Sequence, residues 1–365
     1  MAGDGSSGLK MPTTTNRWRA YIRRCRAIEW SSQRRSTGGE GINVAVASKI
    51  GTIPLNARAR MRSVRRAELV NSNGLDYADA LPAPERDCPV SKANTSKTAS
   101  AKSGRIFIGI GGWTFEPWRG VFYPEKLAQA KELQYAASKL TSIEINGTYY
   151  GSQKPESFRK WAGEVPDGFV FSVKGPRFAT NRRVLAEAGD SVQRFYDSGV
   201  LELGDRLGPV LWQFAPTKKF DEADFGKFLE LLPRELEGRQ LRHVVEVRHD
   251  SFCVPAFVAL IRKFETPVVF AEHGKYPAIA DVTGDFVYAR LQKGNDEIKT
   301  CYPPKQLDAW AKRLQLWAEG GEPDDLPHVD STKPKKMPRD VFAYVIHEGK
   351  IRAPAGAMEL IARVS

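Results

Sequence analysis

The sequence has few cysteines, and their spacing does not match a metal or disulfide pattern. The four cysteines, Cys25, Cys88, Cys253 and Cys301, form no Cys-x-x-Cys pair and no paired arrangement. Neither a zinc ribbon nor a disulfide-stapled secreted scaffold is therefore indicated. Because unpaired cysteines suit a reducing compartment, we expect a cytoplasmic protein.

The sequence also lacks long hydrophobic runs and two familiar enzyme motifs. No stretch approaches the ~20 apolar residues of a membrane-spanning helix, and the N-terminus has no apolar signal segment, so we expect no membrane span. GIGGW at 109–113 lacks the third glycine and the acidic partner of a dinucleotide fingerprint, and no Ser-His-Asp triad is readable. These glycines fit a tight turn after a strand, where the backbone can approach a ligand closely.

Positive charge is concentrated in the first third of the chain. The 365 residues carry 55 Lys and Arg against 43 Asp and Glu, a net charge of +12. Residues 1–103 hold 18 of the basic and 8 of the acidic residues, which leaves 37 against 35 for the rest. Because residues 1–103 are poor in apolar side chains, we expect a mostly disordered, Arg- and Ser-rich extension and linker. Nucleic acid is a predicted partner only through this basic extension.

One segment of the extension has a helical pattern. In NRWRAYIRRCRAIEW, residues 16–30, apolar side chains recur at helical spacing between arginines. This pattern is typical of a basic amphipathic helix that binds a membrane surface, an RNA or an import receptor. The alternative is that the segment is an upstream extension without a function of its own.

From residue 104 onward, short apolar runs alternate with helical patterns. Eight strand candidates occur, and seven are followed by a helical pattern; HGKYPAIADVTG, after the sixth, has no helical period. Alternating strands and helices imply parallel pairing. Eight units in about 260 residues predict an α/β fold, a (β/α)8 TIM-type barrel over 104–365, and a doubly wound open sheet is the alternative. The strand candidates are RIFIGIG, TSIEIN, FVFSVK, LGPVLWQF, HVVEVRH, TPVVFAEH, DFVYARLQ and DVFAYVIHE.

Polar residues interrupt several of these strands at alternate positions. In HVVEVRH, Val245 and Val247 would pack against helices, so Glu246 and Arg248 would face the barrel interior. Active sites of this fold lie at the C-terminal ends of the strands, where these residues occur. In the sixth strand either Glu272 or His273 faces the axis, and in the eighth either His347 or Glu348. The same alternation turns these further residues inward: Ser142, Glu144, Asn146, Val170, Ser172, Lys174, Gln213, Val244, Tyr288, Arg290 and Gln292.

The inward residues suggest acid–base chemistry on an anionic or polyhydroxylated small molecule. Glu144 and Glu246 are the candidate catalytic acid and base. Cationic side chains would bind a phosphate or carboxylate, amides would orient hydroxyl groups, and aromatic rings would stack on a sugar or base. The candidate substrate-binding residues are Trp113, Asn146, Tyr149, Lys174, Gln213, Arg248, His249 and Arg290, with Tyr150 and Trp212 as further aromatic neighbours.

Two other interpretations remain open. Glu246 with Arg290 or Lys174, and Glu144 with Arg248, would form ion pairs that merely fill the barrel, and the aromatic residues would be core. A divalent metal is a second option, because carboxylates and histidines gather near the strand ends. No His-x-x-x-His or Asp-x-His pair marks such a site. The possible ligands are Glu144, Glu246, Glu272, His249 and His273.

Six ordered motifs between Arg105 and the C-terminus resemble domain-of-unknown-function family 72, the YecE-like proteins. The resemblance implies a TIM-type barrel related to sugar isomerases, without an established activity. The motifs are GIGGW, PWRGVFYP, EINGTYY, FVFSVK, LGPVLWQF and VEVRHDSF. Recurrent family positions that match here are Trp118, Glu144, Asn146, Tyr149, Lys174, Gln213, Glu246, Arg248 and His249.

The sequence departs from the family pattern at the C-terminal ends of the seventh and eighth predicted strands, which form one side of the mouth of the predicted barrel. Gln292 and Lys293 replace a His-Gly pair after the seventh strand, and Ile346, His347 and Glu348 replace a Phe- and Asn-containing segment near the eighth. A changed substrate or a lost activity would both explain this. We predict a sugar-isomerase-like enzyme acting on a small molecule. The alternatives are a metal-assisted phosphoesterase or nucleic-acid enzyme, and a noncatalytic ligand-binding barrel.

Overall fold

The structure, a computed structural model, describes residues 103–365. The extension expected over residues 1–103, its amphipathic segment and its role in nucleic-acid binding lie outside the described residues, apart from Ser103, and these points stay predictions. Among the described helices, none is long and apolar enough to cross a membrane.

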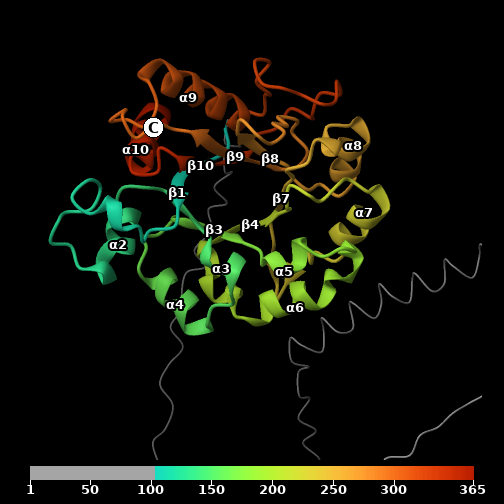
Figure 1. Ribbon diagram of the computed structural model, residues 1–365, viewed down its shortest axis with the longest axis horizontal. Coiled ribbons are helices and arrows are strands. Elements are labelled where there is room, and N and C mark those ends of the chain that lie inside the picture. Colours follow the sequence, from blue (N-terminus) through green and yellow to red (C-terminus); the bar gives the residue numbers. More distant parts are fainter. Residues whose placement is uncertain (1–102) are drawn as a thin grey trace, which may run out of the picture. The chain divides into compact units, whose positions relative to one another are not determined.

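Eight parallel strands form the sheet at the centre of the described part (Figure 1). The order is β7-β4-β3-β2-β1-β10-β9-β8, so the first and last strands of the chain are neighbours. The two edges meet through one bridge between Val245 and Val268, where the Val245 amide donates to the Pro267 carbonyl at 3.0 Å. The sheet is therefore a nearly closed barrel, as predicted. Its strands are β1 (Ile106–Gly111), β2 (Ser142–Ile145), β3 (Val170–Lys174), β4 (Leu207–Gln213), β7 (His243–Glu246), β8 (Val269–Glu272), β9 (Phe286–Lys293) and β10 (Asp340–Glu348).

Helices surround the strands in Figure 1 and cover the outer face of the sheet. Seven of the eight strands are followed by a helix of six or more residues, and the segment between β8 and β9 has none, as the sequence predicts. A short hairpin, β5 (Glu235–Leu236) and β6 (Arg239–Gln240), precedes β7. The α-helices are α2 (Glu132–Ala137), α3 (Gly147–Tyr150), α4 (Pro155–Gly163), α5 (Arg177–Thr180), α6 (Gly189–Asp197), α7 (Glu222–Glu230), α8 (Pro255–Lys263), α9 (Pro304–Ala318) and α10 (Ala353–Val364).

The first helix is shorter than its sequence pattern predicts. The pattern extends over residues 125–140, but the structure has a single 3-10 turn, η2 (Gln129–Lys131), before α2. Residues 125–131 are mostly exposed, whereas Leu133, Ala136 and Ala137 are buried. Because helices in proteins are stabilised mainly by packing of an apolar face, only the packed part is helical.

The alternation predicted along the strands is confirmed by two separate hydrophobic clusters. Ile143, Val173 and Val245 belong to the large cluster between sheet and helices. A second, smaller cluster lies inside the barrel, and Val170 packs against it. The two faces of each strand therefore have different environments, which fixes the register of the sheet. The inner cluster comprises Phe107, Leu211, Val244, Val269, Ala271, Phe286, Tyr288, Phe342, Tyr344 and Ile346.

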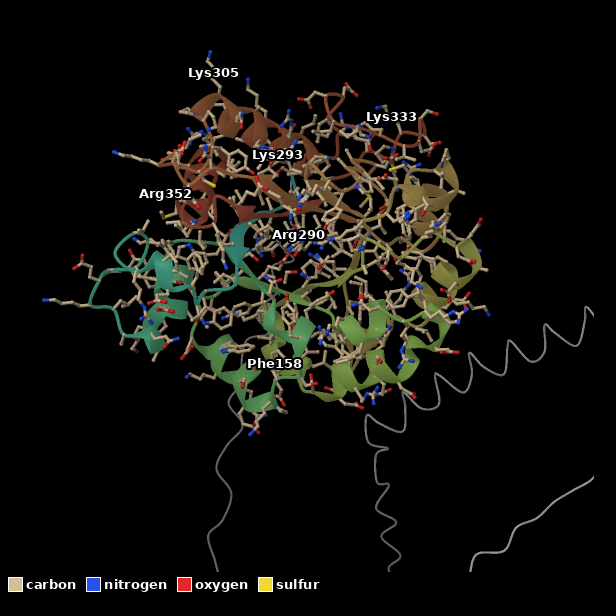
Figure 2. The ribbon with its side chains drawn as sticks, viewed as in Figure 1. Phe158, Arg290, Lys293, Lys305, Lys333 and Arg352 are labelled. Atoms are coloured by element: carbon tan, nitrogen blue, oxygen red, sulfur yellow. The ribbon has the colours of Figure 1, made fainter. Side chains whose placement is uncertain are left out.

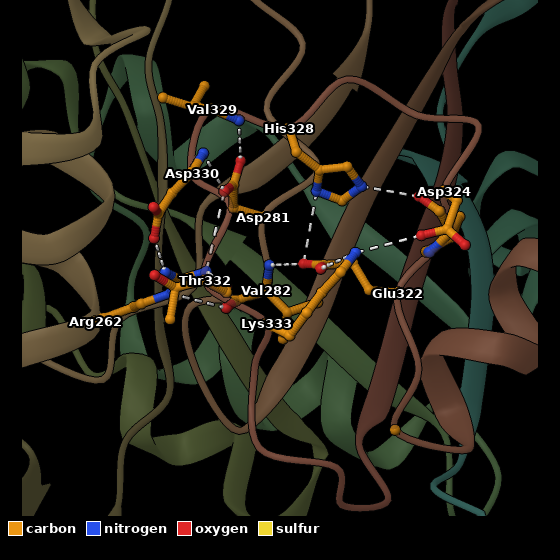
Figure 3. Close-up of polar contacts among 12 residues, drawn as sticks. Arg262, Asp281, Val282, Glu322, Asp324, His328, Val329, Asp330, Thr332 and Lys333 are labelled. Atoms are coloured by element: carbon orange, nitrogen blue, oxygen red, sulfur yellow. Dashed lines mark hydrogen bonds and ion pairs between the residues drawn. The ribbon is translucent and has the colours of Figure 1, made fainter.

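A long segment after α9 packs beside the residues that precede β9 (Figure 3). The Asp281 carboxylate accepts the backbone amides of Val329 and Asp330 at 2.8 and 2.9 Å. Glu322 accepts the Val282 amide at 2.9 Å and lies 3.6 Å from Lys333 Nζ. These contacts attach residues 322–333 to the segment that leads into β9.

Candidate active site at the barrel mouth

A cluster of charged side chains occupies the C-terminal end of the barrel interior. Glu246 and Lys174 are the last residues of their strands, β7 and β3, and Arg290 lies past the middle of β9. Glu144, Glu246, Arg290 and Lys174 are between 0 and 7% exposed. In Figure 2 Arg290 lies inside the ring of strands. The structure therefore brings together the inward charges that the sequence predicts.

Arg290 bridges the two glutamates. Its Nη2 donates to Glu144 Oε1 at 3.0 Å, and its Nη1 donates to Glu246 Oε2 at 2.6 Å. Burial would lower the pKa of this guanidinium, but the two carboxylates outweigh burial and raise it. The sequence suggested a pair between Glu144 and Arg248; in the structure Arg248, two residues beyond the end of β7, binds Glu246 instead, and Glu144 binds Arg290.

Glu246 accepts hydrogen bonds from three side chains. Besides Arg290, Gln213 Nε2 donates at 2.8 Å and Arg248 Nε donates at 2.8 Å. Burial would raise the pKa of this carboxyl, but the charges of Arg290, Arg248 and Lys174 outweigh burial and lower the pKa from 4.5 to about 2. Glu246 is therefore an anion throughout the physiological range.

Hydroxyl groups form a layer directly beneath the charges. Tyr288 Oη donates to Glu144 Oε2 at 2.7 Å and lies 2.8 Å from Ser172 Oγ. Ser142 Oγ lies 2.7 Å from Tyr344 Oη. Burial, with the nearby Glu144 charge, raises the pKa of Tyr288, so this phenol stays a hydrogen-bond donor. The layer separates the charges from the aromatic side chains at the other end of the barrel.

Two cations at the mouth lie over aromatic rings. Lys174 Nζ is 4.7 Å from the centre of the Tyr149 ring, and the Arg248 guanidinium is 4.7 Å from that of Tyr276. The Tyr276 ring stacks in turn on His273 at 4.3 Å. Such contacts orient a cation while leaving its hydrogen-bond donors available. Arg248 keeps part of its side chain, 20%, exposed.

The remaining candidates lie around this cluster or outside it. Asn146 donates to the Glu144 carbonyl at 3.3 Å and is half-buried beside the cluster. His249 accepts the Ser251 amide at 3.1 Å and so caps the 3-10 helix η5 (Asp250–Phe252). Trp113 packs edge-on against Trp161 in the outer hydrophobic layer, away from the charged cluster.

Two further aromatic candidates do not join the charged cluster. Trp212 is fully buried in the outer layer and donates its indole N–H to His243 Nδ1 at 3.0 Å. Tyr150 lies on α3 and is 67% exposed. Trp118, a recurrent family position, is buried and donates to the Lys350 carbonyl at 2.8 Å, which ties the loop after β1 to the loop after β10.

Two strand ends that the sequence leaves ambiguous are now partly defined. In β8, Val269 and Ala271 face the barrel interior, whereas Glu272 accepts a hydrogen bond from Tyr302 Oη at 2.8 Å. In β10, Phe342, Tyr344 and Ile346 face inward, and the register shifts between Val345 and Glu348. The side chain of His347 lies outside the described part.

Sequence reasoning did not select three residues that the structure adds to the site. Tyr288 was placed inward by alternation, and its contact with Glu144 makes it part of the cluster. Gln292, also placed inward, is 3% exposed, and its Oε1 has no hydrogen-bond partner among the described groups. Tyr276 lies in the loop after β8. The sequence of this loop has neither a helical nor a strand periodicity, so it does not predict where the side chain points.

The glycine-rich turn after β1 has the conformation that the sequence predicts. Gly112 has a φ of 75°, in the left-handed region that favours glycine. Asn146 Nδ2 and Ile346 would lie only 3.0 and 3.1 Å from a side-chain carbon added to Gly111. Glycine at 111 therefore allows Asn146 and Ile346 to pack closely against the end of β1.

The carboxylates of the mouth bind cationic side chains and do not surround a position that a metal ion could occupy. Among residues 103–365, no group of three or more His, Cys, Asp or Glu side chains is placed to hold a metal ion. The oxygen atoms of Glu144 and Glu246 already accept hydrogen bonds from Arg290, Tyr288, Gln213 and Arg248. The donor set thus fits an anionic ligand better than a divalent cation.

A cavity of about 770 Å³ opens at the opposite, N-terminal end of the barrel. Its basic side chains are mostly engaged. Arg234 pairs with Glu265 at 3.3 Å, Arg242 pairs with Asp340 at 2.8 Å, and Arg262 pairs with Asp330. This end of the barrel is therefore lined by ion pairs that join neighbouring loops.

Comparison with known proteins agrees with the sequence motifs. UPF0759 protein YunF of Bacillus subtilis is 30% identical over 116 residues, which are 30% of this chain and 40% of that protein. UPF0759 protein YecE of Escherichia coli K12 is 28% identical over 148 residues, 40% of this chain and 50% of that protein. The chain thus spans about half the length, or less, of the curated relatives it matches.

A solved structure shows the same fold. A DUF72 family protein from Thermotoga maritima has a TM-score of 0.52 at 21% identity, and the match covers 70% of this chain and 97% of that one. The family model described as "Protein of unknown function DUF72" matches residues 107–365, which is most of the chain. The chain therefore belongs to the DUF72 family, as the ordered motifs from GIGGW to VEVRHDSF predict.

Proposed function

We propose that the chain is an enzyme that binds a small polyhydroxylated or anionic molecule at the barrel mouth and acts on it by proton transfer, as sugar isomerases do. The observation that carries this proposal is the charged cluster itself. Side chains from β2, β3, β7 and β9 converge at the end of the barrel where active sites of this fold occur.

The charge balance of the cluster favours a ligand over a purely structural plug. Arg290, Arg248 and Lys174 are three cationic groups, and Glu144 and Glu246 are two anionic ones, so one positive charge is left over when all are ionised. In addition, Arg290 Nε and Gln292 Oε1 are buried and have no hydrogen-bond partner among the described groups. Buried polar groups in native proteins are nearly always satisfied, so unpaired ones at a mouth favour contact with a ligand or water.

Arg248 is the proposed anchor for an anionic group of the substrate. It is the most exposed cation of the cluster, and its Nε and Nη2 both contact Glu246 Oε1 at 2.8 Å. A guanidinium fixed on one edge by a carboxylate presents its other edge for bidentate recognition of a carboxylate or phosphate. Asn146, Tyr149 and His249 would contact the hydroxyl groups, and Gln213 would act mainly by orienting Glu246.

Glu144 and Glu246 remain the proposed catalytic carboxylates, with different roles. Because burial is outweighed by neighbouring cations and the pKa of Glu246 is lowered to about 2, this group stays ionised and can stabilise positive charge, but it cannot donate a proton at neutral pH. Glu144 accepts from the Tyr288 hydroxyl and from Arg290, and so orients both of these donors. The proton donor must therefore be a group other than Glu246.

A ligand screen by thermal shift on the full chain tests the proposal, with and without added divalent metal. A molecule that binds only the folded state raises the apparent stability by mass action. For a ligand found this way, Arg248→Ala should weaken binding tenfold or more, which is about 1.4 kcal/mol. Glu246→Gln should abolish turnover.

The matched control is Arg242→Ala, which removes an ion-paired arginine at the opposite end of the barrel and should leave binding unchanged. The proposal fails if sugar phosphates, sugar acids and keto acids all leave the melting temperature unchanged. It also fails if Arg242→Ala weakens binding as much as Arg248→Ala does. Binding that appears only with divalent metal would favour the phosphoesterase alternative.

A further inference from the structure

The amine of Lys174 differs from the other cations of the mouth because it has no polar partner. The side chain is 7% exposed. Within residues 103–365, no hydrogen bond or ion pair to its Nζ is present. The Nζ atom lies 4.7 Å from the centre of the Tyr149 ring. Arg290 and Arg248, in contrast, each bind a carboxylate.

The carboxylates near Lys174 are engaged elsewhere. Glu144 accepts from Arg290 and Tyr288, and Glu246 accepts from Arg290, Gln213 and Arg248. Burial, together with the charge of Arg290, lowers the pKa of Lys174 from 10.5 to about 8, against the opposing effect of the two glutamates. On the order of a tenth of these amines is then neutral at pH 7, compared with a few in ten thousand for an ordinary lysine.

The backbone at Lys174 is held firmly. Thr148 Oγ1 donates to the Lys174 carbonyl at 2.6 Å, and the Gly175 amide donates to the Leu211 carbonyl at 2.8 Å. A side-chain carbon at Gly175 would lie 2.5 Å from the Trp212 ring, so only glycine allows this close approach. The point from which the Lys174 side chain enters the mouth is therefore fixed.

We propose that Lys174 is a nucleophile that forms an imine with the aldehyde or ketone group of a small ligand at the mouth. This inference rests on the proposed function insofar as both use the same binding site. A buried, unpaired lysine beside other cations is the arrangement in which an amine acts as a nucleophile towards carbonyl groups.

The reaction balances without an oxidant or a reductant. The lone pair of the neutral Nζ forms a bond to the carbonyl carbon, and the π electrons of the C=O bond move to oxygen. The carbinolamine then loses its oxygen as water together with the two hydrogens of the original amine, which leaves the C=N bond. An imine withdraws electrons from the adjacent carbon, so it would assist the proton transfer proposed above.

The surroundings of Lys174 indicate the class of carbonyl compound. Arg248 presents a partly exposed guanidinium, and the amide of Gln292 has a buried oxygen without a partner in the described part. A hydroxyaldehyde, hydroxyketone or keto acid would use both groups while its carbonyl reaches the amine. The ring of Tyr149 covers one side of the amine and limits the access of water.

Lys350 provides a matched comparison within the same domain. Its Nζ lies 3.9 Å from the Phe115 ring, and partial burial lowers its pKa as well. However, Lys350 is exposed and follows β10 without contact to the charged cluster. If aromatic contact alone activated a lysine, Lys350 would react like Lys174.

Reductive trapping on the full chain tests the proposal. The protein is incubated at pH 7 with glycolaldehyde, the smallest hydroxyaldehyde, then reduced with borohydride, and labelled lysines are located by peptide mass mapping. We expect Lys174 to be labelled on the order of tenfold faster than Lys350 or exposed Lys293, because more of its amine is neutral. Its labelling rate should level off above about pH 8, whereas the rates at the other two should keep rising.

Variants and unfolding provide the controls. Lys174→Met and Lys174→Arg should remove the fast labelling, Lys350→Met should retain it, and unfolding in urea should make all lysines react alike. Because the labelled peptide is identified in the unmodified sequence, the result does not depend on whether a variant folds.

Two outcomes separate this inference from the proposed function. If Lys174 reacts no faster than Lys350, or if its rate keeps rising with pH, the nucleophile proposal is wrong even where a ligand binds through Arg248. If Lys174 is labelled fast but no metabolite binds or turns over, the imine site stands and the proposed isomerase-like function is overturned.

Discussion

The two ends of the barrel are both rich in arginine and carboxylate, but they use these groups differently. At the N-terminal end, Arg242 pairs with Asp340 and Lys333 pairs with Glu322. The side chains of Arg242 and Lys333 are 42 and 67% exposed. At the mouth, Arg290 lies between two glutamates and its side chain is 6% exposed. Figure 2 shows Arg290 among the strands and Lys333 at the periphery.

The difference shows that ion pairs alone do not identify a functional site. The pairs at the N-terminal end join neighbouring loops, and Figure 3 shows Asp281 and Glu322 also accepting backbone amides. The charges at the mouth come from four strands and leave an amine, an amide oxygen and a guanidinium nitrogen without partners in residues 103–365. Burial of the charges and their convergence from several strands distinguish the site from the scaffold.

The largest expected difference between the two ends concerns Arg290. Arg290→Met would leave Glu144 and Glu246 buried next to an apolar side chain, so the free energy of unfolding should fall by about 3–5 kcal/mol. Arg242→Met at the other end should cost less than about 1 kcal/mol, because its partner Asp340 can be solvated. Urea denaturation of the full chain measures both values. Equal losses for the two variants would contradict the contrast in burial drawn above.

Acid should weaken the N-terminal end before it affects the mouth. Burial lowers the pKa of His243 from 6.5 to about 4, although a hydrogen bond to the Pro233 carbonyl opposes this. Because the unfolded chain then binds the proton more tightly, stability is complete above pH 6.5 and is lost as the pH falls towards 4, by roughly 2–3 kcal/mol. Glu246, with a pKa lowered from 4.5 to about 2, should contribute no loss until the pH falls below 4.5.

Urea unfolding between pH 7 and 4.5 measures this effect, and His243→Gln provides the control. The variant loses the hydrogen bond from Trp212 and is less stable at pH 7, but its stability should depend less on pH over this range. A variant with the same pH dependence as the original sequence would show that another group is responsible.

A smaller effect is expected at Asp281. Asp281→Ala would leave the amides of Val329 and Asp330 without their acceptor, which should cost about 1–3 kcal/mol in unfolding free energy. Binding of a ligand at the mouth should not change, because the mutated group lies at the opposite end of the barrel. If the variant lost ligand affinity without losing stability, the separation of scaffold and site would be incorrect.

The smallest effect is expected at Lys333. This side chain is 67% exposed and lies 3.3 Å from Asp324 and 3.6 Å from Glu322. Lys333→Met should change the unfolding free energy by less than about 1 kcal/mol, since exposed ion pairs gain little over solvated charges. A loss above 2 kcal/mol in urea denaturation would mean that the loop after α9 depends on this contact.

The strands could be predicted from the sequence because one face of each strand packs against helices and the other faces the barrel interior. This difference produces a regular alternation of residue types along the strand. Val245 and Val247 pack outward and Glu246 inward, as alternation requires. The helix predicted over 125–140 was too long, because most of its first half is exposed. A helical periodicity in the sequence does not show whether the segment packs against the rest of the protein, so the sequence alone does not give the true length of this helix.

The members of the candidate site could also be predicted, but not their partners. Alternation placed Glu144, Glu246 and Arg290 inside, whereas which of them meet depends on the stagger of strands that are distant in the chain. The bridging position of Arg290 follows from the register of β9 with β8 and β10. Tyr276 projects from a loop without a period, so no pattern in the sequence gave its direction.

The pairing of β1 with β10 has a consequence for biosynthesis. Ile106 to Ile110 are aligned with Val341 to Val345, so the first strand of the barrel acquires its second neighbour only from β10, more than 200 residues later in the chain. A ribosome must therefore synthesise the chain through β10 before the ring of strands can be completed. Any premature stop before residue 340 would leave β1 and β9 as open edges, which are surfaces for aggregation.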